Sequence, residues 1–360
     1  MKIDDKTSHN SPSIRFPEFT GEWEYFSIND VCSEFKSGKN IKADLISSNG
    51  NFPVYGGNGL RGYTSSYNHD GLYVLIGRQG ALCGNVRSVF GKIYITEHAI
   101  AVAGNEKSDT NFLHYLFLKM NLGQYSDQSA QPGLAVNKLL KLKVLLPSIS
   151  EQIKIAKLLS LLDERIAVQS RLIDRLQSLM KGIRHRIINE AKGKIVCLCE
   201  VSDIYQPQTI SSADLTETGY PVYGANRIIG HYTSYNHEAE QVCITCRGNT
   251  CGGVNYTKSK SWITGNAMVV NVDRYQNIVS KRYLYHYLSN CDFNSIISGS
   301  GQPQIVRAPL AKFKIILPTV MQQYKIAHCL DVIQNKINVN SNILNLLIRQ
   351  KQYLLRKMFI

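Results

Sequence analysis

The chain has 360 residues, which at roughly 150 residues per domain excludes a single small module and predicts two domains. Its 44% of hydrophobic residues exclude a disordered chain, because so many apolar side chains bury enough surface to offset chain entropy. Lys and Arg number 41 against 27 Asp and Glu, and the net charge of +14 favours a polyanionic partner, nucleic acid ahead of an anionic membrane.

The expected compartment is the cytoplasm, with no membrane partner. The start of the sequence, residues 1–10, lacks the apolar core of a signal peptide, and no run approaches the 18 or more apolar residues of a membrane span. The 9 cysteines are an odd, scattered set, which predicts reduced thiols rather than a disulfide framework.

The chain repeats itself once. Pro53-Val-Tyr-Gly-Gly-Asn58 recurs 168 positions later as Pro221-Val-Tyr-Gly-Ala-Asn226. Farther on, the offset becomes 171, where Leu-Lys-Val-Leu-Leu-Pro147 recurs as Phe-Lys-Ile-Ile-Leu-Pro318. Short β-branched and aromatic runs in each copy predict strands, and residues 111–122 predict a helix. Each copy is therefore expected to be a mixed α+β globular domain.

A heptad pattern follows each copy. Apolar residues advance in alternating steps of three and four, which predicts two long helices that each carry a coiled-coil seam with one polar layer. Ser148-x-x-Glu151 and Thr319-x-x-Gln322 are predicted capping boxes at the helix starts. The seam residues are Leu159, Leu162, Ile166, Gln169, Ile173 and Leu176 in the first helix, and Leu330, Ile333, Ile337, Asn340, Leu344 and Leu347 in the second.

Two arrangements of the helices follow from this pattern. Each seam packs on its own globular domain, or the two helices pair as an antiparallel coiled coil that separates the domains under a pseudo-two-fold axis. In the second arrangement Gln169 and Asn340 face each other and fix the register. The predicted segments are an N-terminal segment 1–21, a first domain 22–147, a first helix 148–192, a second domain 193–318 and a second helix 319–360.

The sequence carries no recognisable catalytic constellation, so we predict no catalytic, cofactor or metal residue. A phosphate-binding glycine loop, a dinucleotide fingerprint and an adenine methyltransferase loop are all missing from the sequence. Glu34-Phe-Lys36 has nuclease-like spacing that we interpret as incidental, and His69 and His237, in repeated Tyr-Asn-His triplets, are expected to be structural. Cys243-x-x-Cys246-x-x-x-x-Cys251 resembles a zinc set, but a site there would exist in only one copy.

The pattern that remains is typical of a binding protein with two separate binding domains. Arg78 aligns with Arg247, each on a loop after an apolar strand, where it contacts a phosphate, reads guanine or is simply a solvated turn residue. Residues that both copies share are expected to be scaffold or phosphate contacts, and those that differ are expected to read bases. The candidate DNA-binding residues are Asn58, Arg61, Arg78, Gln79, Arg87, Asn226, Arg227, Arg247, Asn249 and Lys258.

The sequence resembles the DNA-specificity subunit of type I restriction-modification enzymes. The resemblance rests on Arg15-Phe-Pro-Glu-Phe-Thr-Gly-Glu-Trp23, on Pro53-Val-Tyr-Gly-Gly-Asn58, and on Gln131-Pro132 followed by Leu-Leu-Pro147 and Glu151-Gln-Ile-Lys-Ile-Ala156. It implies that each domain is a target recognition domain for one half of a bipartite, asymmetric site in double-stranded DNA. The coiled coil then sets the spacing between the two half-sites.

The resemblance also implies partners. Two modification subunits that bind S-adenosylmethionine dock on the helices and domains, and restriction subunits that use ATP and Mg join them, so this chain is itself not an enzyme. Two other interpretations stay open: a self-sufficient enzyme that modifies or cleaves DNA, and a non-catalytic coiled-coil scaffold whose domains bind protein or carbohydrate. DNA binding by phosphate contacts falls steeply with salt, which separates it from the scaffold interpretation.

Overall fold

The computed structural model describes residues 10–127, 132–299 and 301–360. The chain forms two compact units: the first runs to Gln169 and resumes at Ile343–Ile360, and the second is Ser170–Asn342. The division falls inside the two long helices, so each unit holds one globular domain and a part of each helix. Residues 1–9 and Gln131, on which parts of the signal-peptide and resemblance arguments rest, lie outside the described residues.

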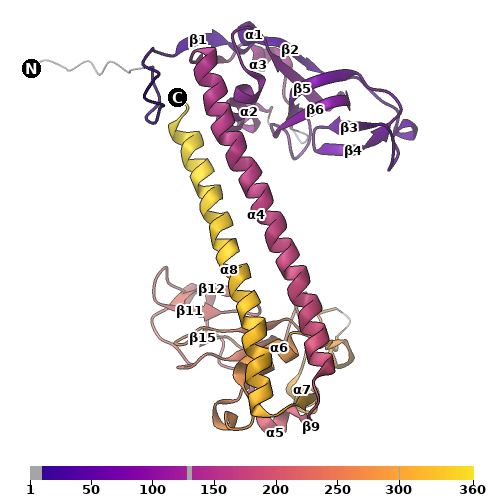
Figure 1. Cartoon of the computed structure of the whole chain (residues 1–360), viewed down its shortest axis with the longest axis vertical. Coiled ribbons are helices and arrows are strands. Elements are labelled where there is room, and N and C mark those ends of the chain that lie inside the picture. Colours follow the sequence, from indigo (N-terminus) through magenta and orange to yellow (C-terminus); the bar gives the residue numbers. More distant parts are fainter. Residues whose placement is uncertain (1–9, 128–131, 300) are drawn as a thin grey trace, which may run out of the picture. The chain divides into compact units, whose positions relative to one another are not determined.

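The globular domain of the first unit is built on a six-stranded sheet of order β2-β7-β5-β6-β3-β4 (Figure 1). Only the β3–β6 pairing is parallel within this sheet. A separate pair joins β1 antiparallel to β8 and closes the domain beside the start of the first long helix. The strands are β1 (Glu24–Ser27), β2 (Cys32–Ser37), β3 (Phe52–Gly56), β4 (Gly59–Thr64), β5 (His69–Gly77), β6 (Val86–Ile95), β7 (Ala99–Gly104) and β8 (Lys143–Leu146).

Helix α2 packs its apolar face on this sheet. It begins after Asp109, whose carboxylate accepts the backbone N–H of Phe112 at 2.8 Å, and it ends where Asn121 adopts a left-handed conformation with φ of 49°. Phe112 and Phe117 are fully buried, and Phe112 lies edge-on to Trp23. The helices of this domain are α1 (Ile28–Val31), α2 (Thr110–Met120), α3 (Val136–Leu140) and the 3-10 turns η1 (Ala43–Leu45) and η2 (Leu122–Tyr125).

The domain of the second unit repeats the same plan with its sheet divided in two. A four-stranded sheet has the order β10-β16-β13-β14, and a three-stranded sheet has the order β12-β11-β15. The strands are β9 (Lys194–Cys197), β10 (Asp203–Tyr205), β11 (Tyr220–Tyr223), β12 (Ile228–Tyr232), β13 (Val242–Thr245), β14 (Val254–Tyr256), β15 (Trp262–Ile263), β16 (Ala267–Asn271) and β17 (Lys314–Leu317). The helices are α5 (Leu198–Val201), α6 (Lys281–Leu288), α7 (Arg307–Ala311) and the 3-10 turns η3 (Ser212–Asp214), η4 (Asp273–Tyr275) and η5 (Asn294–Ile296).

The two domains share pairing registers at the offsets of the sequence repeat. Val54 pairs with Tyr94 across the parallel β3–β6 contact, and Val222 pairs with Trp262 across the parallel β11–β15 contact. β17 pairs antiparallel with β9, as β8 pairs with β1. The predicted α+β fold with two repeated domains is confirmed.

Two long helices follow the domains, α4 (Ile149–Glu190) and α8 (Val320–Lys357). The capping box at the start of α8 forms, because Gln322 N–H donates to Thr319 Oγ1 at 3.4 Å and Thr319 N–H donates to Gln322 Oε1 at 3.2 Å. At the start of α4 the capping box stays a prediction, and both oxygens of the Glu151 carboxylate accept hydrogen bonds from Arg15, at 2.7 Å each. A charged guanidinium binds a carboxylate strongly, so Glu151 anchors the N-terminal segment through Arg15.

The predicted seam residues of both long helices are buried or half-buried. In the first unit, where the opening part of α4 lies beside the closing part of α8 (Figure 1), Leu159, Leu162 and Leu347 belong to one hydrophobic cluster with the domain core. In the second unit Ile188 of α4 and Ala327 of α8 share a cluster. Each helix part therefore packs on the other helix and on its own domain.

The two polar residues of the seam, Gln169 and Asn340, belong to different units. Gln169 ends the first unit, and Asn340 lies in the second, where its amide donates to Lys336 O at 2.7 Å. The pairing of Gln169 with Asn340 stays a prediction, as do the segment boundaries. Within the described ranges, every helix is too short or too polar to cross a membrane.

Candidate nucleic-acid interface

A surface depression in the first unit brings together several of the candidate DNA-binding residues. Its volume is about 260 Å³, and its lining comprises Gly56, Gly57, Asn58, Arg61, Gln79, Gly80 and His98. These residues come from the end of β3, the β3–β4 turn and the start of β4, from the loop that follows β5 and from the loop that precedes β7. Asn58, Arg61 and Gln79 are exposed, so their amide and guanidinium groups are available to a ligand.

Arg87 joins the same region from β6. Gly59, the first residue of β4, has a φ of +106°, a conformation that favours glycine. A side chain at Gly59 would lie 2.9 Å from the guanidinium carbon of Arg87, so this guanidinium rests on the turn. Four of the five candidates in the first unit therefore share one surface.

The loop of residues 77–84 is held in place by backbone hydrogen bonds. Arg78 N–H donates to His98 O at 2.9 Å, Gly80 N–H donates to Pro132 O at 3.0 Å, and Cys83 N–H donates to Gly80 O at 2.9 Å. These bonds leave the side chain of Gln79 pointing out of a fixed backbone, where it is exposed. The side chain of Arg78 is half-buried.

The loop of residues 245–252 in the second unit repeats these bonds one for one. Cys246 N–H donates to Asn266 O at 3.1 Å, Gly248 N–H donates to Pro303 O at 3.0 Å, and Cys251 N–H donates to Gly248 O at 2.9 Å. The offset in this loop is therefore 168.

The alignment of Arg78 with Arg247 is consequently wrong. The backbone bonds match Arg78 to buried Cys246 and match exposed Gln79 to exposed Arg247. Aligning the two arginines displaces one loop by one residue relative to the other. The glycines with positive φ fix the correct register. Gly80 and Gly248 have φ of +82° and +84°, and Gly84 and Gly252 have +87° and +88°.

The remaining candidates of the second unit lie in two places. Asn226 and Arg227 are exposed in the β11–β12 turn, which is tied to the 245–252 loop because Thr245 Oγ1 donates to Ala225 O at 2.6 Å. Asn249 is exposed within that loop. Lys258 lines a different depression, of about 700 Å³, with Ile228 and Lys260 among its other residues.

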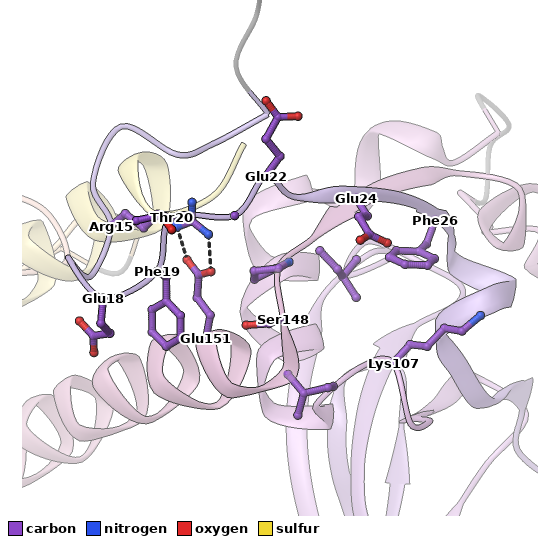
Figure 2. Close-up of a pocket in the computed structure, with 14 residues that line it drawn as sticks. Arg15, Glu18, Phe19, Thr20, Glu22, Glu24, Phe26, Lys107, Ser148 and Glu151 are labelled. Atoms are coloured by element: carbon purple, nitrogen blue, oxygen red, sulfur yellow. Dashed lines mark hydrogen bonds and ion pairs between the residues drawn. The ribbon is translucent and has the colours of Figure 1, made fainter.

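A further pocket, of about 500 Å³, lies where the N-terminal segment crosses the start of α4, and its chemistry is unlike that of a phosphate site. Figure 2 shows the Arg15 guanidinium directed at the Glu151 carboxylate, with Glu18, Glu22 and Glu24 around the same hollow. The Glu151 contact also raises the pKa of Arg15, chiefly through the hydrogen bonds between them. We assign this pocket to anchoring of the N-terminal segment, because its acidic lining repels phosphate.

The histidines of the Tyr-Asn-His triplets hold the fold together. The side-chain amide of Asn68 donates to Ile95 O at 2.9 Å, and its Oδ1 accepts from Ile95 N–H at 2.8 Å. His69 Nδ1 lies 2.6 Å from the same Asn68 Oδ1. Asn236 makes the same pair of bonds with Ile263. Glu34 of the nuclease-like triplet is engaged by His69 Nε2 at 2.9 Å.

The zinc-like cysteines lie in different surroundings. Cys243 is packed in an apolar cluster, and burial raises its pKa to about 12. Cys246 accepts a hydrogen bond from Gln206 Nε2 at 3.1 Å. Among the residues the structure describes, no group of three or more His, Cys, Asp or Glu is arranged to hold a metal ion.

Sequence reasoning missed His98. Its Nδ1 lies 3.0 Å from Gln79 Oε1, so it orients the amide of Gln79 within the depression. The residue at the 168 offset from His98 is Asn266, so the sequence repeat does not mark His98 as a site residue. Its role is seen only in the contact between its loop and the loop of Gln79.

The fold and these loops define a class: a protein with two repeated α+β domains whose equivalent loops carry different side chains. Two segments, residues 20–178 and 191–349, match the family described as the type I restriction modification DNA specificity domain. The chain therefore belongs to this family.

Named relatives agree with this assignment. The specificity subunit of the type I restriction enzyme EcoprrI of Escherichia coli is 50% identical over 112 residues, which span 31% of this chain and 28% of that protein. A putative type I restriction enzyme specificity subunit of Haemophilus influenzae, S.HindORF215P, is 24% identical over 92% of both chains. The crystal structure of an S subunit from M. genitalium is similar in fold, with a TM-score of 0.77 at 17% identity over 97% of this chain and 99% of that one.

Proposed function

We propose that this chain is the non-catalytic, sequence-specific DNA-binding subunit of a type I restriction-modification complex, with each domain reading one half of a bipartite site. The observation that carries the proposal is the pair of equivalent loops, 77–84 and 245–252, with the same backbone and different exposed side chains. One scaffold that presents two sets of side chains is suited to two different short sequences.

Charge and side-chain chemistry support DNA as the ligand. Arg61 lines the first depression and Arg87 is exposed next to Gly59, and Arg227, Arg247 and Lys258 are exposed on the second domain. Amides and guanidiniums are the groups that read adenine and guanine edges in the major groove. The net charge of +14 supplies a favourable field for phosphates, and binding is expected to weaken steeply as salt rises.

The long helices are proposed to set the spacing of the half-sites and to dock the two modification subunits. Each unit presents exposed apolar residues at heptad spacing beside its seam, Leu161 and Val168 in the first and Val332 and Val339 in the second, each 52–57% exposed. The second pair lies 171 positions after the first, so both units offer the same face. Two matched apolar faces are suited to two copies of one partner.

The cofactors belong to those partners in this proposal. The modification subunits bring S-adenosylmethionine, and the restriction subunits bring ATP and Mg. The role of this chain is to place the partners on a chosen DNA sequence.

Methylation mapping tests the proposal. The chain is co-expressed with a type I modification subunit in a host without adenine methylation, and methylated adenines are mapped across the genome. We expect one asymmetric motif in two parts separated by unspecified bases. A continuous motif, or no methylation by a complex that assembles, would contradict it, and cleavage or methylation by the purified chain alone would favour the self-sufficient enzyme.

A further inference from the structure

Gln79 and Arg247 occupy the same place in the two recognition domains. Their neighbours Gly80 and Gly248 adopt φ of +82° and +84°, and each donates its N–H to a proline carbonyl at 3.0 Å. Gln79 also forms an isolated antiparallel bridge with Gly133, and Arg247 forms one with Gln304. The backbone beneath the two side chains is thus the same.

The tip of each loop is open. A Cβ added at Gly80 or at Gly248 meets nothing within 4 Å, although other glycines of the same loops touch neighbouring backbone or side-chain atoms. Gln79 and Arg247 are both exposed beside this open space. A nucleic acid can therefore approach this position in both domains without displacing protein atoms.

The two side chains differ in the hydrogen bonds that they offer. A glutamine amide has a donor and an acceptor, which match the N7 acceptor and the N6 donor of adenine. An arginine guanidinium has donors only, which match the N7 and O6 acceptors of guanine. In the first domain His98 fixes the amide, because its Nδ1 lies 3.0 Å from Gln79 Oε1.

We infer that this loop position is a specificity-determining site in both domains, where Gln79 reads an adenine in one half-site and Arg247 reads a guanine in the other. The inference rests on the proposed function. A phosphate can accept a hydrogen bond from either side chain, but such a contact carries no sequence information, so exchanging the two side chains separates the two roles. The preceding position, Arg78 and Cys246, is half-buried or buried and is expected to support the loop.

The test exchanges the two side chains one at a time. Gln79→Arg and Arg247→Gln are made in the full chain, each assembled with the modification subunit, and methylated motifs are mapped as for the wild type. We expect Gln79→Arg to replace one adenine by guanine in one half-site, and Arg247→Gln to replace one guanine by adenine in the other half-site. Competition between duplexes that differ at that base pair should show the preference reversed, by roughly 10- to 100-fold.

Controls separate reading from charge and from folding. Asn137→Arg and Arg274→Gln make the same charge changes at exposed positions outside the two loops and should leave the motif unchanged. Gln79→Ala should accept any base at that position. Motifs unchanged by both exchanges, or changes that fall in the same half-site, would overturn the inference, whereas loss of the bipartite motif in the wild type would overturn the proposed function instead.

Discussion

His114 and His286 lie where a helix of each recognition domain meets a long helix. His286 of α6 is fully buried, and its Nε2 donates to Asp331 Oδ1 of α8 at 2.8 Å. Burial lowers its pKa to about 4, and the cations of Arg184 and Arg282 add to this effect against the opposing Asp331 carboxylate. The structure therefore holds a neutral histidine that bonds a carboxylate.

His114 of α2 has the same property in the first unit. Burial lowers its pKa to about 4, with a further lowering by Lys351 and an opposing contribution from Asp163. Lys351 reaches Asp163 at 2.5 Å, and the hydroxyl of Tyr115 donates to the same carboxylate at 2.9 Å. A positive charge on His114 would face Lys351 in a largely buried place.

Because the pKa of these two histidines is lowered, we expect mild acid to weaken the fold. Their pKa is lower in the folded chain than the ordinary 6.5, so the unfolded chain binds more protons once the pH falls below 6.5. Stability is fully present above pH 6.5 and is lost towards pH 4, at about 1.4 kcal/mol per histidine for each pH unit. Urea unfolding of the full chain at pH 7 and pH 5.5 measures it.

The matched variants are His114→Gln with His286→Gln, and His328→Gln as the exposed control. The double variant is expected to lose most of the pH dependence, and the control is expected to keep it. A wild type equally stable at both pH values would contradict the prediction.

At the scale of elements, one buried glutamine in each unit joins the recognition domain to its long helix. Gln323, fully buried near the start of α8, donates to Ile278 O and Pro318 O at 2.9 Å each and accepts from Ser280 N–H at 2.7 Å. Gln152 of α4 makes the same three bonds with Lys107, Pro147 and Asp109, at the 171 offset. One amide thereby fixes the angle between the domain helix and the long helix.

Removing this amide is expected to destabilise its unit. Gln323→Leu keeps the volume but leaves a buried N–H and two carbonyls without partners, which costs about 3 kcal/mol. Gln152→Leu should do the same in the first unit. The free energy of unfolding in urea measures both, with exposed Gln350→Leu as control; a loss below roughly 0.5 kcal/mol, the range of ordinary surface substitutions, would show that the amide is not a brace.

Much of the fold can be predicted from the periodicity of the sequence, but the hydrogen bonds of Gln152 and Gln323 cannot. The heptad steps predict two long helices with a seam, and the structure has them as α4 and α8, because a seam is a regular signal along one helix. The bonds of Gln152 depend on residues 107 and 109 lying beside the start of α4, which no local pattern states. The repeat does contain a hint, since both copies place a glutamine there.

The candidate interface could likewise be predicted only in part, because local sequence patterns do not show which loops meet. Side-chain type and repeat differences predicted Gln79 and Arg87, whereas His98 and the match of Gln79 with Arg247 needed the backbone bonds of the loops. Three residues that separate the two offsets lie between the loop and Pro318, and they do not disturb the loop itself. Contacts between loops are set by the sheet beneath them, so they emerge only once the strands are paired.

At the scale of the whole molecule, the proposed spacing role makes a quantitative prediction. One heptad inserted into both α4 and α8 lengthens each helix by about 10 Å, at 1.5 Å per residue. That length corresponds to roughly three base pairs of duplex. We expect the mapped motif to gain about three unspecified bases while both half-sites keep their sequences.

Single insertions serve as the comparison, because one heptad in α4 alone mismatches the seam and is expected to abolish assembly. An unchanged spacer in the double insertion would contradict the role of the helices as a ruler. A changed half-site sequence would show that the helices also shape the reading loops.

The pairing of β1 with β8 and of β9 with β17 has a consequence for how such proteins diversify. Each recognition domain leaves and rejoins its helical frame through two adjacent antiparallel strands, Glu24↔Leu146 to Ser27↔Lys143 in the first unit and Leu317↔Lys194 to Lys314↔Cys197 in the second. A segment bounded by those strands is joined to the frame at one place. Under the proposed function, exchanging that segment would change the target sequence and leave the frame unchanged.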